Sequence, residues 1–204
     1  MHKKLIYVAT NNEHKISEFQ AILPSNVDVK PYAALGLLVE WVENGNTFLA
    51  NSFIKSRAIA QKTSHPVLAD DSGLCVYNLD LKPGVHSARY AQETGNDRAA
   101  IDRANRSLLL KEMDHLKNPE NRKAYFTTVI TYVDAEKNEY SFEGRCDGTI
   151  ATKESGANGF GYDSIFIGNG MTRSFAELTA QEKNSLSHRG AALEKFAAFL
   201  KTQI

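Results

Sequence analysis

Several features that would assign a chain to a particular class are scarce in this sequence. Its 204 residues include only 2 cysteines, too few for a disulfide framework or the paired spacing of a metal finger. Cys75 and Cys146 both lie in strand-like runs, so we expect buried free thiols in a reducing cytosol. The 24 Lys and Arg residues balance the 24 Asp and Glu residues, so no overall field attracts nucleic acid or a membrane. Any anion site must therefore be local.

Long apolar stretches are also missing. The first apolar run, residues 5–9, is too short for the core of a signal peptide or for a membrane span. No repeat, low-complexity tract or long linker divides the chain. With 42% hydrophobic residues, 204 positions suffice to bury one sizeable core. We therefore predict a cytoplasmic protein with a single domain over residues 1–204.

Helix-like and strand-like segments alternate along the chain, which indicates an α/β fold. Apolar spacing predicts helices over residues 47–62 and 97–116. A last helix would turn Leu193, Phe196 and Leu200 inward. The strand-like segments are residues 5–9, 67–70, 74–77, 124–133 and 139–146, of which the last two form a long hairpin.

A polar turn follows the first apolar run and leads into a helix that Asn11 or Asn12 can cap. A helix start offers free backbone N–H groups and a positive dipole end, which with Thr10 and Lys15 suit a polyphosphate. An ordinary capped helix is the alternative. A P-loop is not supported, because the sequence here has no Walker-type glycine pattern.

Two adjacent carboxylates, Asp70 and Asp71, stand between an apolar run and a turn marked by Gly73. A strand that ends there would aim Asp71 and the Ser72 hydroxyl into a cleft, where carboxylate oxygens suit a hard cation such as Mg²⁺. The alternative is a solvated turn, because Asp, Ser and Gly are ordinary turn residues.

Two further clusters carry groups that could recognise a ligand. In the glycine-rich segment 156–163, Phe160 or Tyr162 could stack on a base and Asp163 could accept hydrogen bonds from its edge, unless the aromatics belong to the core. The second cluster has basic side chains that suit phosphate and carbonyl oxygens, although a basic run is usually solvated. These side chains are Lys183, His188 and Arg189.

Together the clusters resemble the inosine/xanthosine triphosphate pyrophosphatases, a family that removes deaminated purine nucleotides from the nucleotide pool. The resemblance spans nearly the whole chain, and its motifs occur in the family's order. They are residues 10–15 (against T-G-N-x-x-K), 47–55 (T-F-x-E-N-x-x-x-K), 70–74, 83–90, 159–163 and 187–190. Asn11 and Asn158 replace glycines of the pattern, which asparagine can do at a positive φ. Ala50 replaces a glutamate and removes a carboxylate near the expected phosphate site.

The resemblance implies Mg²⁺-dependent hydrolysis of ITP, dITP or XTP to a monophosphate and pyrophosphate. Asp71 would activate water or hold the metal, with Glu40, seven residues before Thr47, as second metal ligand and Glu43 as the alternative. The triphosphate would be held by Thr10, Asn11, Asn12, Glu13, His14, Lys15, Lys55 and Ser72. Phe160 would stack on the base, with Gly161, Tyr162, Asp163, Lys183, His188 and Arg189 around it.

The resemblance also implies a mixed, elongated sheet flanked by helices, two lobes around a central substrate cleft, and a homodimer. The basic groups would favour the 6-oxo group of hypoxanthine or xanthine over the 6-amine of adenine. Two other functions stay open. A non-catalytic nucleotide sensor would fit the departures at Asn11 and Ala50, whereas an RNA-binding module is disfavoured by the zero net charge.

Overall fold

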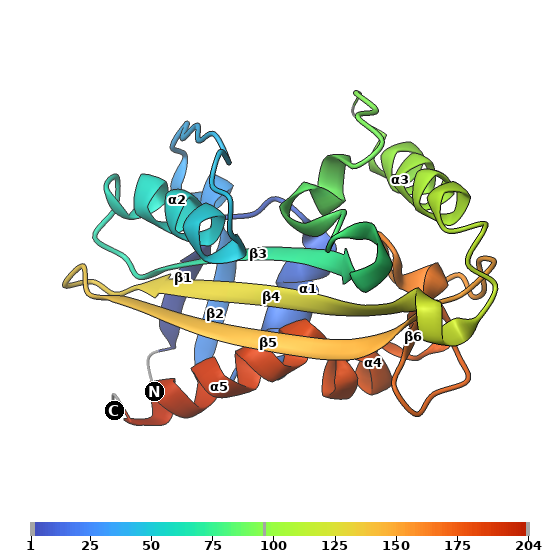
Figure 1. The fold of residues 1–204 in the computed structure, drawn as a ribbon. Coiled ribbons are helices and arrows are strands. Elements are labelled where there is room, and N and C mark those ends of the chain that lie inside the picture. Colours follow the sequence, from blue (N-terminus) through green and yellow to red (C-terminus); the bar gives the residue numbers. More distant parts are fainter. Residues whose placement is uncertain (1–2, 96, 203–204) are drawn as a thin grey trace. The chain divides into compact units, whose positions relative to one another are not determined.

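The computed structural model describes residues 3–95 and 97–202. Its strands form one mixed sheet in the order β2-β1-β3-β4-β5-β6 (Figure 1). β1 pairs in parallel with β2 and β3, whereas β5 pairs antiparallel with β6. The strands are β1 (Lys4–Val8), β2 (Val27–Pro31), β3 (Val67–Val76), β4 (Lys123–Val133), β5 (Glu139–Ile150) and β6 (Phe166–Gly168). The helices are α1 (Glu13–Ile22), α2 (Phe48–Ala60), α3 (Arg98–Glu112), α4 (Ala180–Leu186) and α5 (His188–Thr202).

The chain forms two compact units. The first contains the chain up to Asp71, Thr128–Gly144 and the chain from Arg189 onward, and the second contains Ser72–Thr127 and Arg145–His188. The expected mixed α/β sheet with flanking helices is confirmed. No helix within residues 3–95 and 97–202 is long and apolar enough to cross a membrane.

In the first unit, side chains of β3 alternate between two apolar clusters, as the period of a strand requires. Leu68 packs with Phe19 of α1 and Phe196 of α5, in a cluster that also takes up Leu193 and Leu200. Val67 and Ala69, on either side of Leu68 in the sequence, pack instead with Ile59 of α2. Helices α1 and α5 therefore cover one face of β3, and α2 covers the other.

The second unit has its own core around the other end of β3. Leu74 and Val76 pack with Leu109 of α3 and with a group of phenylalanines. Phe126 of β4 lies 4.5 Å from Phe166 between ring centroids, at the tilted geometry that aromatic pairs prefer. The first unit thus buries two apolar clusters and the second unit buries one of its own.

The prediction of two strands joined by a turn at Ser72 and Gly73 is wrong. Residues 67–76 form one strand, almost entirely buried. The turn preference of Asp, Ser and Gly is overridden because sheet pairing and burial on both faces favour an extended backbone there. The hairpin of residues 124–133 and 139–146 is confirmed, and β5 runs on to Ile150.

Candidate active site

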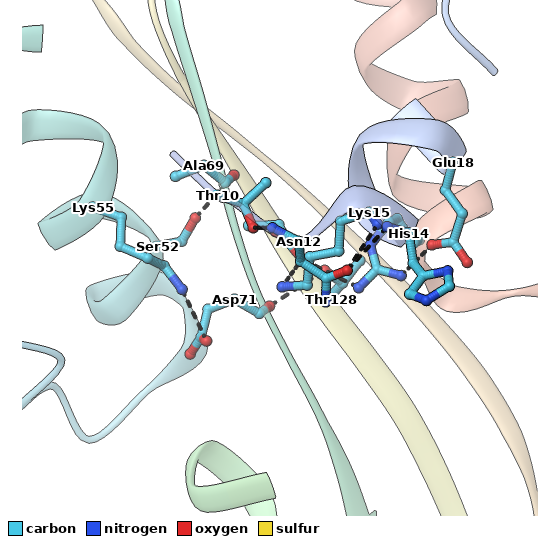
Figure 2. Close-up of polar contacts among 12 residues, drawn as sticks. Thr10, Asn12, His14, Lys15, Glu18, Ser52, Lys55, Ala69, Asp71 and Thr128 are labelled. Carbon is cyan, nitrogen blue, oxygen red and sulfur yellow. Dashed lines mark hydrogen bonds and ion pairs between the residues drawn. The ribbon is translucent and has the colours of Figure 1, made fainter. Parts of the chain in front are cut away.

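The two adjacent carboxylates of β3 serve different faces of the strand. Asp70 shares the face of Leu68 and contacts α1 and α5, whereas Asp71 points toward α2. Figure 2 shows Lys55 and Asp71 on one side of β3 and Lys15 and Glu18 on the other. Both carboxylates are buried, with 1% and 7% of their surfaces exposed. One continuous strand therefore places two adjacent carboxylates in two different charge clusters.

On the α2 face, Lys55 joins two carboxylates. Its Nζ lies 3.2 Å from Asp71 Oδ1 and 3.3 Å from Glu43 Oε2. α2 fixes Lys55 through hydroxyl contacts one turn away: Ser52 Oγ donates to the Ala69 carbonyl at 3.2 Å and lies 2.9 Å from Thr131 Oγ1. The helix is thereby tied to β3 and β4 beside the charged cluster.

Burial and charge act in opposite directions on this cluster. Burial raises the pKa of the Asp71 carboxyl above its usual value; Lys55 opposes the rise and Glu43 adds to it. Burial alone would lower the pKa of Lys55, but Asp71, Asp70 and Glu43 outweigh it and keep this pKa above the usual value. Lys55 therefore stays cationic beside a carboxylate that binds protons more readily than usual.

The loop before α2 brings Glu43, rather than Glu40, to this cluster. Asn51 of α2 accepts a hydrogen bond from the Gly45 backbone N–H at 2.8 Å, which holds the loop against the helix. A Cβ on Gly45 would come 2.7 Å from Asn51 Oδ1, so glycine is required for this close approach. Glu40 is exposed, in the part of the loop that precedes Trp41.

A divalent cation fits this cluster as a site completed by substrate. Asp71 Oδ2 is buried and accepts no hydrogen bond from any described residue. Within residues 3–95 and 97–202, no group of three or more His, Cys, Asp or Glu side chains could hold a metal ion. Mg²⁺ commonly binds one or two carboxylates and takes its remaining ligands from water and substrate phosphates. Asp71 and Glu43 meet that requirement.

Ala50 occupies a helix-capping position. Thr47 caps α2, and its Oγ1 accepts a hydrogen bond from the Ala50 N–H at 3.1 Å. A glutamate at position 50 would complete a capping box by reaching back to the Thr47 backbone. Ala50 thus lies in the first turn of α2, and the expectation that it removes a carboxylate near the phosphate site stays a prediction.

On the opposite face of β3, Asp70 lies between two cations. Lys15 Nζ is 2.8 Å and Arg189 Nη2 is 3.2 Å from Asp70 Oδ2. Arg189 also pairs with Glu18 of α1 and is only 3% exposed. Burial would raise the pKa of Asp70, but Lys15 and Arg189 outweigh it and hold this pKa well below the usual range. Asp70 is thus a permanent anion that links β3 to α1 and α5.

The start of α1 has the expected cap. Asn12 accepts hydrogen bonds from the backbone N–H groups of His14 and Lys15 at 3.0 and 3.4 Å, and Thr10 Oγ1 accepts one from Asn12 N at 3.1 Å. Asn11, Glu13 and His14 are exposed. Neither Asn11 nor Asn158 has a positive φ, so the expected conformational reason for these replacements of glycine is wrong.

In the second unit, the glycine-rich segment forms a second charged group. Asp163 Oδ2 accepts hydrogen bonds from the Phe160 N–H at 2.9 Å and from Lys183 Nζ at 2.7 Å. The same ammonium lies 4.7 Å from the centre of the Phe160 ring. Gly159 has φ 75°, and a Cβ there would come 2.1 Å from Asp163 Oδ2. A half-buried aromatic ring and a buried cation thus lie together, both held by the carboxylate of Asp163.

The remaining candidate residues of this unit have different environments. Tyr162 is buried, and its hydroxyl donates to the Ser87 carbonyl at 2.9 Å, so it belongs to the core rather than to a stacking surface. His188 stacks on Phe126, with ring centroids 4.7 Å apart and planes 14° apart. Ser72 is partly buried on β3.

Sequence reasoning missed the polar face of α3. Asp102 and Asn105 are buried on this helix, and Arg106 bonds to the Gly161 carbonyl. Asn105 Oδ1 accepts from the Ala91 N–H at 2.8 Å. Asn105 and Arg106 follow Asp102 by three and four residues, so the three side chains share one helix face. Polar residues on the inward face of an amphipathic helix were the sequence signal that could have identified them.

The comparisons with known proteins cover almost the whole chain. A model of the Ham1 family matches residues 6–199. The dITP/XTP pyrophosphatase of Treponema denticola is 41% identical over 96% of this chain and 98% of its own length. The dITP/XTP pyrophosphatase of Bacillus subtilis is 40% identical, with coverages of 95% and 96%. The solved Ham1 protein of Staphylococcus aureus is 36% identical with a TM-score of 0.84, covering 98% of this chain and 100% of that one.

Proposed function

Because the chain belongs to the Ham1 family, we propose that it hydrolyses ITP, dITP and XTP to the nucleoside monophosphate and pyrophosphate. Relatives about 40% identical along nearly their full length are named for this activity. The group of Lys55, Asp71 and Glu43 is the observation that carries the proposal, because it combines a cation with two carboxylates and phosphoryl chemistry needs both.

The first unit provides the groups for the triphosphate. Lys15 and Lys55 supply positive charge, and the capped start of α1 supplies backbone N–H groups. The other polar residues at 10–15 belong to this proposed set, and Ser72, the first residue of the second unit, is proposed as a further phosphate ligand. Since phosphoryl transfer depends mainly on positioning and charge neutralisation, no covalent nucleophile is required.

Asp71 is the proposed catalytic residue. Mg²⁺, when bound, would neutralise charge on the phosphate oxygens. Asp71 and Glu43 would hold it, in preference to Glu40, because only Glu43 contacts the Lys55 that also pairs with Asp71. The raised pKa of Asp71 suits a group that accepts a proton from the attacking water, and its buried Oδ2 has acceptor capacity to spare.

The second unit provides the groups for the base. Phe160 would stack on the purine, and Lys183, held by Asp163, would donate to the 6-oxo group. Adenine carries a 6-amine and would leave this donor unsatisfied, which disfavours ATP. His188 adds a second donor, fixed in orientation by Phe126. The homodimer and the cytoplasmic location complete the proposal as properties that the family resemblance implies.

A product assay tests the proposed function. The purified protein is incubated with Mg²⁺ and ITP, dITP, XTP, GTP or ATP, and pyrophosphate and orthophosphate are measured separately, with and without a chelator. We expect pyrophosphate from ITP, dITP and XTP, with kcat/KM at least about a hundredfold above that for ATP. Orthophosphate as the sole direct product, or no turnover at all, would overturn the proposal. The latter result would favour a nucleotide sensor.

A further inference from the structure

Helix α3 holds a single residue of the glycine-rich segment from both sides. The Gly161 N–H donates to Asp102 Oδ2 at 2.9 Å, and the Gly161 carbonyl accepts from Arg106 Nη1 at 2.8 Å. Asp102 and Arg106 are four residues apart and so lie on one helix face. Two hydrogen bonds, one to its N–H and one to its carbonyl, fix the position of Gly161 and the orientation of its two peptide groups.

The backbone of Gly161 has a conformation that residues with a side chain rarely adopt. Gly161 has φ 61°, in the left-handed region that glycine occupies without strain. A glycine with free backbone groups would exchange among several conformations, because it has the largest conformational freedom of any residue. Asp102, only 5% exposed, and Arg106 therefore restrict a residue that is intrinsically mobile.

Gly161 directly follows the aromatic residue of the second unit's charged group. Phe160 has its own N–H bonded to Asp163 Oδ2, the oxygen that also accepts from Lys183. On the other side, Tyr162 is anchored by its hydroxyl to the Ser87 carbonyl, and Asn105 of α3 donates to that carbonyl as well, at 3.3 Å. Gly161 therefore joins Phe160, whose ring lies under the Lys183 ammonium, to the anchored Tyr162.

We propose that Asp102 and Arg106 are positioning residues for purine recognition, which act by clamping Gly161 and so fixing Phe160 relative to Lys183. The inference rests on the proposed function and extends it to residues outside the motifs of the sequence. Neither side chain needs to touch the substrate. Their contribution is to fix in advance a stacking surface that the substrate would otherwise have to order on binding.

The test compares variants that remove or keep the hydrogen bond to Gly161. Asp102→Ala removes the acceptor, whereas Asp102→Asn keeps a carbonyl oxygen in the same place. Arg98→Ala is the matched control, because Arg98 pairs with Asp102 at 2.9 Å on the exposed side of α3 and does not contact Gly161. Arg106→Gln is a second variant that shortens the donor to the Gly161 carbonyl.

Three measurements are made on each variant. They are kcat and KM for ITP and for ATP, the inhibition constant of inorganic tripolyphosphate, and the hydrogen-exchange rate of the Gly161 amide. For Asp102→Ala and Arg106→Gln we expect kcat/KM for ITP to fall about tenfold, mostly through KM, and that for ATP to fall no more than about twofold. Tripolyphosphate inhibition should not change, because that ligand has no base. Arg98→Ala and Asp102→Asn should resemble the wild type.

The outcomes separate the inference from the proposed function. Equal losses with ITP and ATP, or loss of tripolyphosphate inhibition, would mean a general structural role and would overturn the inference. An Asp102→Asn variant as impaired as Asp102→Ala would overturn it as well. If Asp102→Ala fails to fold, Arg106→Gln decides by the same criteria. Gly161 exchange accelerated in Asp102→Ala supports the clamp even without turnover, whereas an inactive wild type overturns the proposed function alone.

Discussion

Replacement of Arg189 by alanine should destabilise the protein far more than its position near a substrate motif suggests. The guanidinium pairs with Glu18 and Asp70, and the side chains are 3%, 13% and 1% exposed, respectively. Removing one partner of a buried ion pair costs about 3–5 kcal/mol, because the charges left behind lose their compensation. In a chain of this length each kcal/mol corresponds to about 2–4 °C in Tm, so Arg189→Ala should lower Tm by roughly 6–20 °C.

Thermal and denaturant unfolding, followed by circular dichroism, measure this change. Arg57→Ala is the matched control, because Arg57 forms a bidentate ion pair with Glu139 at 2.7 and 2.6 Å but has 53% of its side chain exposed. Exposed pairs contribute about 0.2–1 kcal/mol, so this control should shift Tm by only a few degrees. Equal shifts in the two variants would refute the assignment of Arg189 to a buried structural network.

A second substitution at this position distinguishes between two roles for Arg189. The family resemblance implies that it lies at the edge of the base, whereas its contacts place it between Glu18 and Asp70. Arg189→Lys keeps a charge with less geometric fit and should retain part of the stability. An ITP-to-ATP preference that survives in this variant supports the structural role. Loss of the preference at unchanged Tm would support contact with the base.

Three further predictions concern single carboxylates. Asp71→Asn should reduce turnover at least about a hundredfold in the pyrophosphate assay while Tm changes little, because the buried carboxylate already has a raised pKa; near-normal turnover would contradict its catalytic role. Glu43→Gln should raise the Mg²⁺ concentration needed for half-maximal rate, and Glu40→Gln should not, so the reverse order in a metal titration would restore Glu40 as ligand. Hydrogen bonds from Arg173 and Thr179 lower the pKa of Glu182 to about 2. The stabilisation of α4 by the Glu182 carboxylate should therefore be fully present above the usual Glu pKa and be lost as the pH falls toward 2. An NMR titration of Glu182 with a midpoint near the usual value would disprove this prediction.

Patterns repeated along the chain were sufficient to predict much of the fold. The hairpin and the inward face of α5 followed from apolar spacing, because that periodicity is a local property of the sequence. The continuity of β3 was not predictable from Ser72 and Gly73, since pairing with neighbouring strands overrides their preference for turns. The strand period, once known, sends Asp70 and Asp71 to opposite faces.

Contacts distant in sequence could not be predicted in the same way. Arg189 and Glu18 are separated by 171 positions, and no local pattern relates them. The choice of Glu43 over Glu40 depends on the path of a loop that Asn51 holds through Gly45. The assignments of individual substrate-binding residues stay predictions, and the variants described above test them.

The loop that carries Glu43 also contains a natural optical probe. The sequence has a single tryptophan. This residue, Trp41, packs edge-on against Tyr32, with ring centroids 5.2 Å apart. All tryptophan emission of the protein therefore originates two positions from the proposed metal ligand. Its intensity and wavelength can report on occupancy of the Asp71 and Glu43 site without any label, in stopped-flow experiments where chemistry and binding have to be timed separately.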